Sequence, residues 1–279
     1  SLVTVWDEFS KQNDKYVDGE CHKRWKSFRD ITNGLGIGTL CYWAKEDNPE
    51  EYKTVREADP VFRVVMESLS GTNYDVANVL YTLYDGKFIC ASTKHNTWYE
   101  FKNNRWHAME SAINLKRKLS TILSNKYTAL ETYYMSKKLA TKEVKDHEVL
   151  NETIKSCKNL RMRVKDTTFK DKVMKECTEL FYDENFESKL DSHTHLIGFE
   201  NGVYDLNATE FRVGNPEDYI LHSTKCNYTE YNPDDPDIQY MYSFLAKVFV
   251  DTELRAYMIS LLASFLDGKV YDQKFHLWT

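Results

Sequence analysis

The chain has 279 residues, of which 42% are hydrophobic and 29% are charged, and its formal net charge is −6. This length and composition suit one or two globular domains that bury hydrophobic cores. No apolar run approaches the length of a membrane-spanning helix and no signal-peptide pattern is present, so no membrane partner is expected.

The first 47 residues predict three short helices, because apolar residues such as Val5, Trp6 and Phe9 recur at helical spacing. Glycines at three alternate positions interrupt this pattern before a third helix, which is expected over residues 39–45. Their G-x-G-x-G spacing lacks a preceding strand and the Lys-Ser/Thr pair that contacts phosphates. It therefore predicts a turn and not a nucleotide-binding loop.

Two proline-containing pairs, Asn48-Pro49 and Asp59-Pro60, predict helix starts, because a polar N-cap followed by proline favours a first helical turn. Asp75 is expected to cap a further helix. We place a domain boundary in this region. Residues 1–60 are predicted to form a first helical module, and residues 61–268 a second domain.

Residues 87–107 predict a small antiparallel sheet, with turns at 94–96 and 102–104. Its aromatic residues are Trp98, Tyr99, Phe101 and Trp106. These rings suit either of two roles, stacking against the bases of a single strand or filling a small core. Core packing is the favoured interpretation, because each ring buries a large apolar area.

The region after this sheet predicts three helices, which run from 110 to 139, from 143 to 164, and from 168 to 182 behind an Asp166 cap. Residues 112–175 carry 16 basic and 7 acidic side chains, a net charge of +9. Residues 176–279 carry 7 basic and 19 acidic side chains, a net charge of −12. The charge of the chain is therefore divided into a basic block and an acidic remainder.

A basic block inside an acidic chain predicts a surface for a polyanion, and the alternative is an ordinary solvated helix face. If the block binds DNA, its side chains contact backbone phosphates without specifying a sequence. The residues predicted to bind DNA are Lys116, Arg117, Lys118, Lys126, Arg161, Arg163 and Lys165. The first three are expected to be exposed.

Asn201-Gly202 predicts a tight hairpin turn between two short strands, because both residues tolerate positive φ angles. Phe199 and Tyr204 are expected to pack as core without a catalytic role. The acidic segment 232–237 lacks the glycine and the distant glutamate of a calcium-binding loop, so it predicts a helix N-cap. Helices are expected over residues 238–249 and 252–266, with Gly268 after the second.

The six cysteines show no Cys-x-x-Cys spacing. In a chain of this length they predict reduced thiols in an intracellular protein and not a disulfide framework. His193 and His195 lie two residues apart, but no cysteine or carboxylate pair nearby completes a set of metal ligands. We therefore expect them to be exposed loop histidines, and no metal site is predicted.

Three blocks of the sequence resemble the poxvirus-type helicase-primase family of nucleocytoplasmic large DNA viruses. Residues 196–220, LIGFENGVYDLNATEFRVGNPEDYI, resemble the collar region that precedes a superfamily 3 helicase domain. Residues 96–107, NTWYEFKNNRWH, resemble the aromatic hairpin of the same proteins. Residues 5–46 resemble the small helical module that follows their primase domain. The blocks occur in the order of that family.

The resemblance implies a mainly helical α+β fold, in which a helical module is followed by a helical collar with small antiparallel sheets. Residues 269–279 resemble the first strand of a P-loop ATPase domain, and the chain ends before a phosphate loop. The chain is therefore expected to be a fragment cut before the ATPase domain. No catalytic residue, cofactor or metal is expected in it.

The implied function is that of a non-catalytic middle region in a viral helicase-primase, located in host cytoplasm or at a viral replication site. Such a region links the primase to a ring-forming DNA helicase, aids oligomerisation and guides single-stranded or forked DNA. The parent protein is expected to be a hexamer that uses ATP and magnesium. Two alternatives stay open, a protein-interaction adaptor with an acidic docking surface and a replication-initiation primase-helicase of phage or plasmid type.

Overall fold

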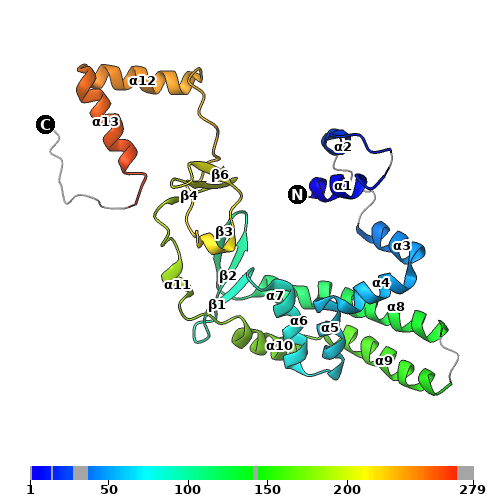
Figure 1. Cartoon of the computed structure of the whole chain (residues 1–279). Coiled ribbons are helices and arrows are strands. Elements are labelled where there is room, and N and C mark those ends of the chain that lie inside the picture. The colour runs from blue at the N-terminus through cyan, green and yellow to red at the C-terminus, as the bar shows by residue number, and fades with distance from the viewer. Residues whose placement is uncertain (1, 14, 28–36, 141–143, 269–279) are drawn as a thin grey trace. The chain divides into compact units, whose positions relative to one another are not determined.

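The computed structural model describes residues 2–13, 15–27, 37–140 and 144–268 (Figure 1). The chain forms two compact units, Ser1–Asp59 and Pro60–Thr279. Helices dominate the described residues, which also contain two sheets of three antiparallel strands. The predicted fold class, mainly helical with small antiparallel sheets, is confirmed.

The described part of the first unit is helical. Its helices are α1 (Leu2–Ser10), α2 (Glu20–Ser27), α3 (Ile37–Asp47) and α4 (Pro49–Ala58). The three predicted short helices are confirmed. So is the helix start at Asn48, whose Oδ1 accepts a hydrogen bond from the Glu51 amide at 3.2 Å. The predicted glycine turn falls largely outside the described residues. Cys21 and Asp7 are buried, and the Tyr16 hydroxyl donates to the Asp7 carboxylate at 3.1 Å.

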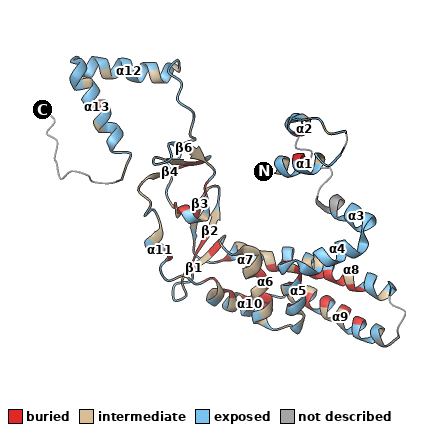
Figure 2. Cartoon of the chain, in the orientation of Figure 1, coloured by how far each residue is buried: buried red, intermediate tan, exposed pale blue. Residues whose placement is uncertain are grey.

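A helical core forms the first part of the second unit. Its elements are α5 (Pro60–Glu67), a 3-10 turn (Ser68–Ser70), α6 (Asn73–Tyr84), α7 (Ile113–Lys118), a π-helical segment (Leu119–Leu123), α8 (Ser124–Ala140), α9 (Val144–Arg163) and α10 (Thr167–Leu180). Apolar side chains at helical spacing line the facing sides of α8 and α9, where Figure 2 shows buried positions. Inside this core the Ser68 and Tyr127 hydroxyls lie 2.8 Å apart and share a hydrogen bond.

Two details of these helices differ from the prediction. The N-cap of α6 is Thr72 and not Asp75, because the Thr72 hydroxyl accepts from the Asp75 amide at 3.1 Å and donates to its carboxylate at 2.7 Å. The long helix begins at Ile113 and not at residue 110, and its hydrogen-bond pattern changes over Leu119–Leu123. The predicted Asp166 cap of α10 is confirmed, since its carboxylate accepts from the Phe169 amide at 2.8 Å.

The first sheet consists of β1 (Phe88–Ser92), β2 (Thr97–Lys102) and β3 (Arg105–Met109) in that order. Asn103 and Asn104 both have positive φ angles, 49° and 66°, and form the turn that was predicted at residues 102–104. Trp98 and Trp106 are 1% and 2% exposed, and Tyr99 is also buried. The interpretation of these aromatic residues as core is therefore confirmed, with Phe101 packed beside them.

The second sheet consists of β4 (Leu196–Phe199), β5 (Gly202–Asp205) and β6 (Glu210–Arg212). The predicted hairpin is confirmed, but Gly202 pairs with Phe199 as the first residue of β5. A β-carbon at Gly202 would lie 2.5 Å from the Arg212 carbonyl oxygen. Glycine is therefore needed at this position because β6 approaches the backbone closely, and not because of a turn. Phe199 and Tyr204 are only half-buried, and the Tyr228 ring packs against both of them.

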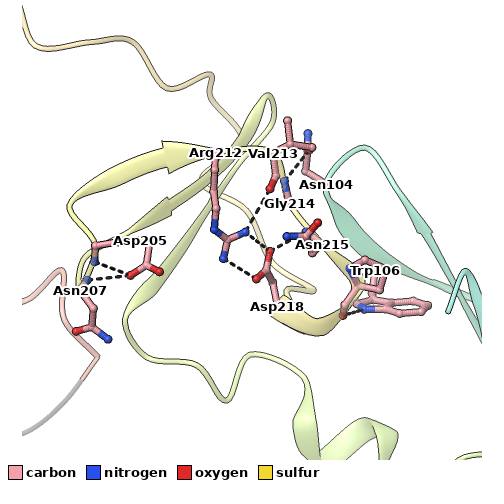
Figure 3. A network of polar contacts seen from close by, with 11 residues as sticks. Asn104, Trp106, Asp205, Asn207, Arg212, Val213, Gly214, Asn215 and Asp218 are labelled. Carbon is pink, nitrogen blue, oxygen red and sulfur yellow. Dashed lines mark hydrogen bonds and ion pairs between the residues drawn. The ribbon is translucent and has the colours of Figure 1, made fainter. Parts of the chain in front are cut away.

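A network of polar contacts joins the two sheets (Figure 3). The Gly214 amide donates to Asn104 Oδ1 at 3.0 Å, and the indole N–H of Trp106 donates to the Pro216 carbonyl at 2.8 Å. Arg212 and Asp218 form a bidentate ion pair with distances of 2.7 and 2.8 Å. The second sheet is thus attached to β3 through side chains as well as through the chain itself.

The last described elements are two helices, which follow α11 (Phe186–Lys189) and the second sheet. They are α12 (Pro236–Val248) and α13 (Thr252–Ser264). The acidic segment caps α12, as predicted, through the Asp235 carboxylate, which accepts from the Asp237 amide at 2.8 Å. α13 ends at Ser264, two residues before the predicted end. The predicted ATPase strand, residues 269–279, lies outside the described residues.

Apolar side chains on α12 and α13 are largely uncovered in the described structure, as the pale blue of both helices in Figure 2 indicates. Tyr240 is 71% exposed and Phe244 is 53% exposed, whereas Met258 is buried. Among the helices described here, none has the length and apolar character needed to span a membrane.

Candidate nucleic-acid interface

The turn between α9 and α10 brings together parts of the chain that are distant in sequence. Ser120 in the π-helical segment donates to the Val164 carbonyl at 3.2 Å, and its hydroxyl accepts from Lys170 Nζ at 3.2 Å. One side chain therefore contacts the end of α9 and the beginning of α10. Short π-helical segments are often found at functional sites, and this one is adjacent to the basic residues at the end of α7.

Five cationic side chains surround this turn, and we call them the basic corner. They are Lys116, Arg163, Lys165, Lys170 and Lys172. Lys116 forms an ion pair with Asp171, which ties α7 to α10. The acidic side chains among them are Asp171 and the N-cap Asp166, so cations outnumber carboxylates at this surface.

Arg163 is held in a defined position. Its Nη1 donates to the Gly71 carbonyl at 3.3 Å, and its guanidinium lies over the Phe169 ring with 4.1 Å to the ring centre. Gly71 has a φ angle of 77°, and a β-carbon there would lie 3.1 Å from Arg163 Nη1. Glycine at this position permits both the left-handed backbone and the approach of the guanidinium.

A pocket opens beside Arg163 between the beginnings of α6 and α10. Its volume is about 510 Å³, and its lining consists of Gly71, Thr72, Asn73, Arg163, Asp166, Thr168, Phe169 and Lys172. Most of these residues carry polar side chains. The pocket is therefore suited to a polar, anionic group and not to an apolar ligand.

The structure brings together only some of the residues predicted to bind DNA. Lys116, Arg163 and Lys165 belong to the basic corner. Arg161 instead forms an ion pair with the buried Glu131 at 3.2 Å, and Lys118 lies over the Tyr84 ring at 4.6 Å. Lys126 is a half-buried residue of α8, and Arg117 is exposed on α7.

The expectation that Lys116, Arg117 and Lys118 are all exposed is wrong for two of them. Lys116 and Lys118 are half-buried, because one is paired with a carboxylate of α10 and the other covers aromatic rings of α6 and β1. Lys170 and Lys172 were not among the predicted residues. Their position one turn after the Asp166 cap is the sequence feature that points to this surface.

The arrangement is suited to holding phosphate groups. Lysine and arginine neutralise backbone phosphates and release counterions, which gives affinity without sequence specificity. Within the described ranges, no group of three or more His, Cys, Asp or Glu side chains is placed to hold a metal ion. His193 and His195 are half-buried and not exposed as predicted, with ring centres 5.8 Å apart, and His193 packs beside Tyr219.

Comparisons with known proteins give two matches to family models. Residues 77–250 match a family described as D5 N terminal like, and residues 1–44 match one described as Primase C terminal 2 (PriCT-2). The first match includes the basic corner and both sheets. The second lies within the first compact unit.

Individual relatives are proteins of large DNA viruses. "Putative helicase L207/L206" of Acanthamoeba polyphaga mimivirus is 32% identical over 279 residues, which are 100% of this chain and 29% of that protein. "Putative helicase 121R" of Invertebrate iridescent virus 3 is 24% identical over 99% of this chain and 33% of its own length. "Putative primase C962R" of African swine fever virus (isolate Pig/Kenya/KEN-50/1950) is 22% identical over 86% of this chain and 27% of its own length. The chain thus spans about a third or less of each of these relatives.

Proposed function

The chain belongs to the D5 N terminal like family, and from this we propose that it is the non-catalytic middle region of a viral helicase-primase. In this role it links a primase to a ring-forming, ATP-driven DNA helicase and guides DNA during replication. The names of its relatives, helicase for some and primase for others, support a place between these two activities.

The proposal assigns a part to each segment. Residues 1–60 form the module that follows the primase, which the match of residues 1–44 supports. Residues 61–268 form the collar of the helicase, and residues 269–279 begin its ATPase domain. ATP and magnesium act in that domain of the parent protein, and the collar contributes contacts between neighbouring copies in a hexamer.

The observation that carries the DNA-guiding role is the basic corner. Cations from α7, α9 and α10 converge on one surface, and within the described chain Arg163, Lys165 and Lys172 form no ion pair with a carboxylate. Such cations are available to phosphates. A single strand or a fork that crosses this surface would be held through its backbone, which suits a protein that must move along any sequence.

Binding of a fluorescent single-stranded oligonucleotide, measured by anisotropy over a series of salt concentrations, tests this role. The variant Lys165→Ala removes one exposed cation of the basic corner. It should weaken binding at low salt and flatten the slope of log affinity against log salt by up to about 0.7, because each lost phosphate contact removes about 0.7 for single strands.

Lys155→Ala is the matched control, because Lys155 is an exposed lysine of α9 that pairs with Glu152 at 4.0 Å. It should leave the slope nearly unchanged. If both variants reduce the slope equally, the binding is a diffuse charge effect. If the wild-type chain binds neither single-stranded nor forked DNA, the DNA-guiding role is wrong for the chain by itself.

A second candidate function is a protein-interaction adaptor, and the exposed face of α12 and α13 favours it. Apolar side chains such as Tyr240 and Phe244 are uncovered there, and acidic residues flank them in a region of net negative charge. Such a surface suits a partner with a basic, partly apolar face. A chain that binds no DNA at low salt, but whose α12 and α13 bind a basic helical peptide, would favour this function over the first.

A further inference from the structure

The pocket beside Arg163 has the properties of a binding site for one particular chemical group. Its lining offers polar groups from three separate segments of the chain, Asn73 at the beginning of α6, Arg163 in α9, and Thr168 and Lys172 in α10. The first segment is far from the other two in sequence, since Gly71 next to it and Arg163 are 92 residues apart. The pocket is therefore formed by the tertiary fold and not by one basic stretch of the sequence.

Arg163 supplies a cation that is already oriented. One of its nitrogens is bonded to the Gly71 carbonyl and its flat face rests on Phe169, so the side chain loses little conformational freedom when a ligand binds. A guanidinium offers five N–H donors, of which this contact uses one. Planar donors of this kind match the oxygens of a phosphate.

Lys172 supplies a second cation at the exposed side of the same pocket. Within the part of the chain that the structure describes, it forms no ion pair. The carboxylate that also lines the pocket, Asp166, is engaged by the Phe169 amide at 2.8 Å as the cap of α10. Two cations and one capped carboxylate leave the pocket with a net positive character.

We infer that this pocket is a binding site for a single phosphate group, with Arg163 and Lys172 as its principal ligands. The inference rests on the proposed DNA-guiding role and deepens it, because it fixes one phosphate of the bound strand at a defined point between α6 and α10. The same chemistry fits a phosphodiester of a nucleic acid strand and a free phosphate or mononucleotide. These two sources are separated by the measurements below.

The test uses the whole 279-residue chain and the variant Arg163→Gln with Lys172→Gln. Anisotropy with a single-stranded oligonucleotide measures strand binding, and we expect the variant to bind about tenfold or more weakly at low salt, since charge-assisted contacts are lost. Melting temperature in inorganic phosphate or thymidine 5′-monophosphate, against chloride at equal ionic strength, measures binding of the free group, because a ligand stabilises the folded state to which it binds.

The controls separate the pocket from general charge and from misfolding. Lys155→Gln removes one exposed cation of α9 at another site and should leave both measurements unchanged. Lys172→Gln alone changes an exposed side chain, so it keeps the fold if Arg163→Gln does not. It should give part of the loss of affinity shown by the double variant.

Each outcome decides the inference. If the double variant loses strand affinity and the free compounds bind only weakly, the site holds a strand phosphate. If the wild type does not bind the oligonucleotide but phosphate or the mononucleotide stabilises it and not the variant, the site stands with a free ligand, and the DNA-guiding role fails. If strand affinity and stabilisation are the same in the wild type and the variants, the pocket is not a phosphate site, whether or not the chain binds DNA elsewhere.

Discussion

Arg212 and Asp218 form their ion pair beside the buried ring of Trp106, where the two sheets meet. Asp218 is 6% exposed. Burial raises the pKa of this carboxyl, but the hydrogen bonds from the Arg212 guanidinium and the Asn215 amide outweigh burial and hold the pKa below its usual value. The charged carboxylate therefore stabilises the joint between the sheets.

A carboxyl whose pKa is lowered by folding contributes stability that is fully present above its unfolded pKa. That stability is lost as the pH falls through its folded pKa, which here means below about pH 4. We expect Asp218→Asn to lower the melting temperature at neutral pH and to reduce its further decrease on acidification. Thermal unfolding followed by circular dichroism between about pH 7 and pH 3 measures both effects.

Asp234→Asn serves as the control for this prediction, since Asp234 is exposed in the loop before α12. It should leave the acid dependence close to that of the wild type. Equal acid dependence in Asp218→Asn and the wild type would mean that other carboxyls determine the stability in acid.

Single residues also show where sequence patterns are ambiguous. Asn201-Gly202 predicted a turn, and a hairpin is present, but the turn is one residue earlier and Gly202 is needed for contact with β6. Asn201 uses its side chain to bind the backbone of Tyr228, with distances of 2.8 and 3.0 Å. Neither contact is visible in the dipeptide, because both partners are more than eight residues away in sequence.

The π-helical segment Leu119–Leu123 shows how an element depends on a distant partner. Ser120 donates to Val164 and accepts from Lys170, so it is the polar contact between this segment and the turn from α9 to α10. We expect Ser120→Ala to lower the free energy of unfolding by about 1 kcal/mol, because one hydrogen bond is lost and Lys170 loses an acceptor. Urea denaturation measures this change.

Thr121→Ala is the matched comparison, because the Thr121 hydroxyl donates to the Arg117 carbonyl within its own helix. Its effect should be clearly smaller. If both variants lower the free energy of unfolding equally, the contact with the α9–α10 turn stabilises the chain no more than a hydrogen bond within one helix.

Most elements were predictable from local patterns. Asn48, Asp166 and Asp235 cap helix starts through contacts within three residues, and α5 begins at Pro60 as expected. The change to π-helical hydrogen bonding was not predictable, because Ser120 and Val164 are 44 residues apart. Thr72 was missed as the cap of α6 because Asp75, three residues later, is also a common cap.

At the scale of the whole molecule, the resemblance to helicase-primase proteins of nucleocytoplasmic large DNA viruses is confirmed. The family models match in the predicted order along the chain, and the relatives come from viruses of this kind. The basic corner was only partly predictable. Net charge identified the region, but the convergence of Gly71, Arg163 and Lys172 depends on how α6, α9 and α10 pack.

The division of charge predicts that copies of the chain attract one another. Residues 112–175 carry +9 and residues 176–279 carry −12. A ring requires two different surfaces on each copy that fit one another, and opposite charges supply such a pair. We expect weak self-association at low salt that decreases as salt is raised, measured by sedimentation velocity at several protein concentrations.

Asp234→Asn with Glu253→Gln removes two exposed acidic groups near α12 and α13 and leaves the caps Asp235 and Asp251 intact. The variant should associate more weakly than the wild type at low salt. Association that is insensitive to salt and to this change would assign the contact to apolar side chains. A strict monomer at high concentration and low salt would contradict the prediction.

The uncovered apolar face of α12 and α13 has a calorimetric consequence. Unfolding exposes apolar surface and increases the heat capacity, by about 12–15 cal/mol/K per residue in an ordinary globular protein. For 279 residues this corresponds to about 3–4 kcal/mol/K. Side chains such as Tyr240 and Phe244 already face water in the folded chain, so their share is missing from the heat-capacity change. When another surface covers these helices, burial of the same side chains gives a negative heat-capacity change of binding.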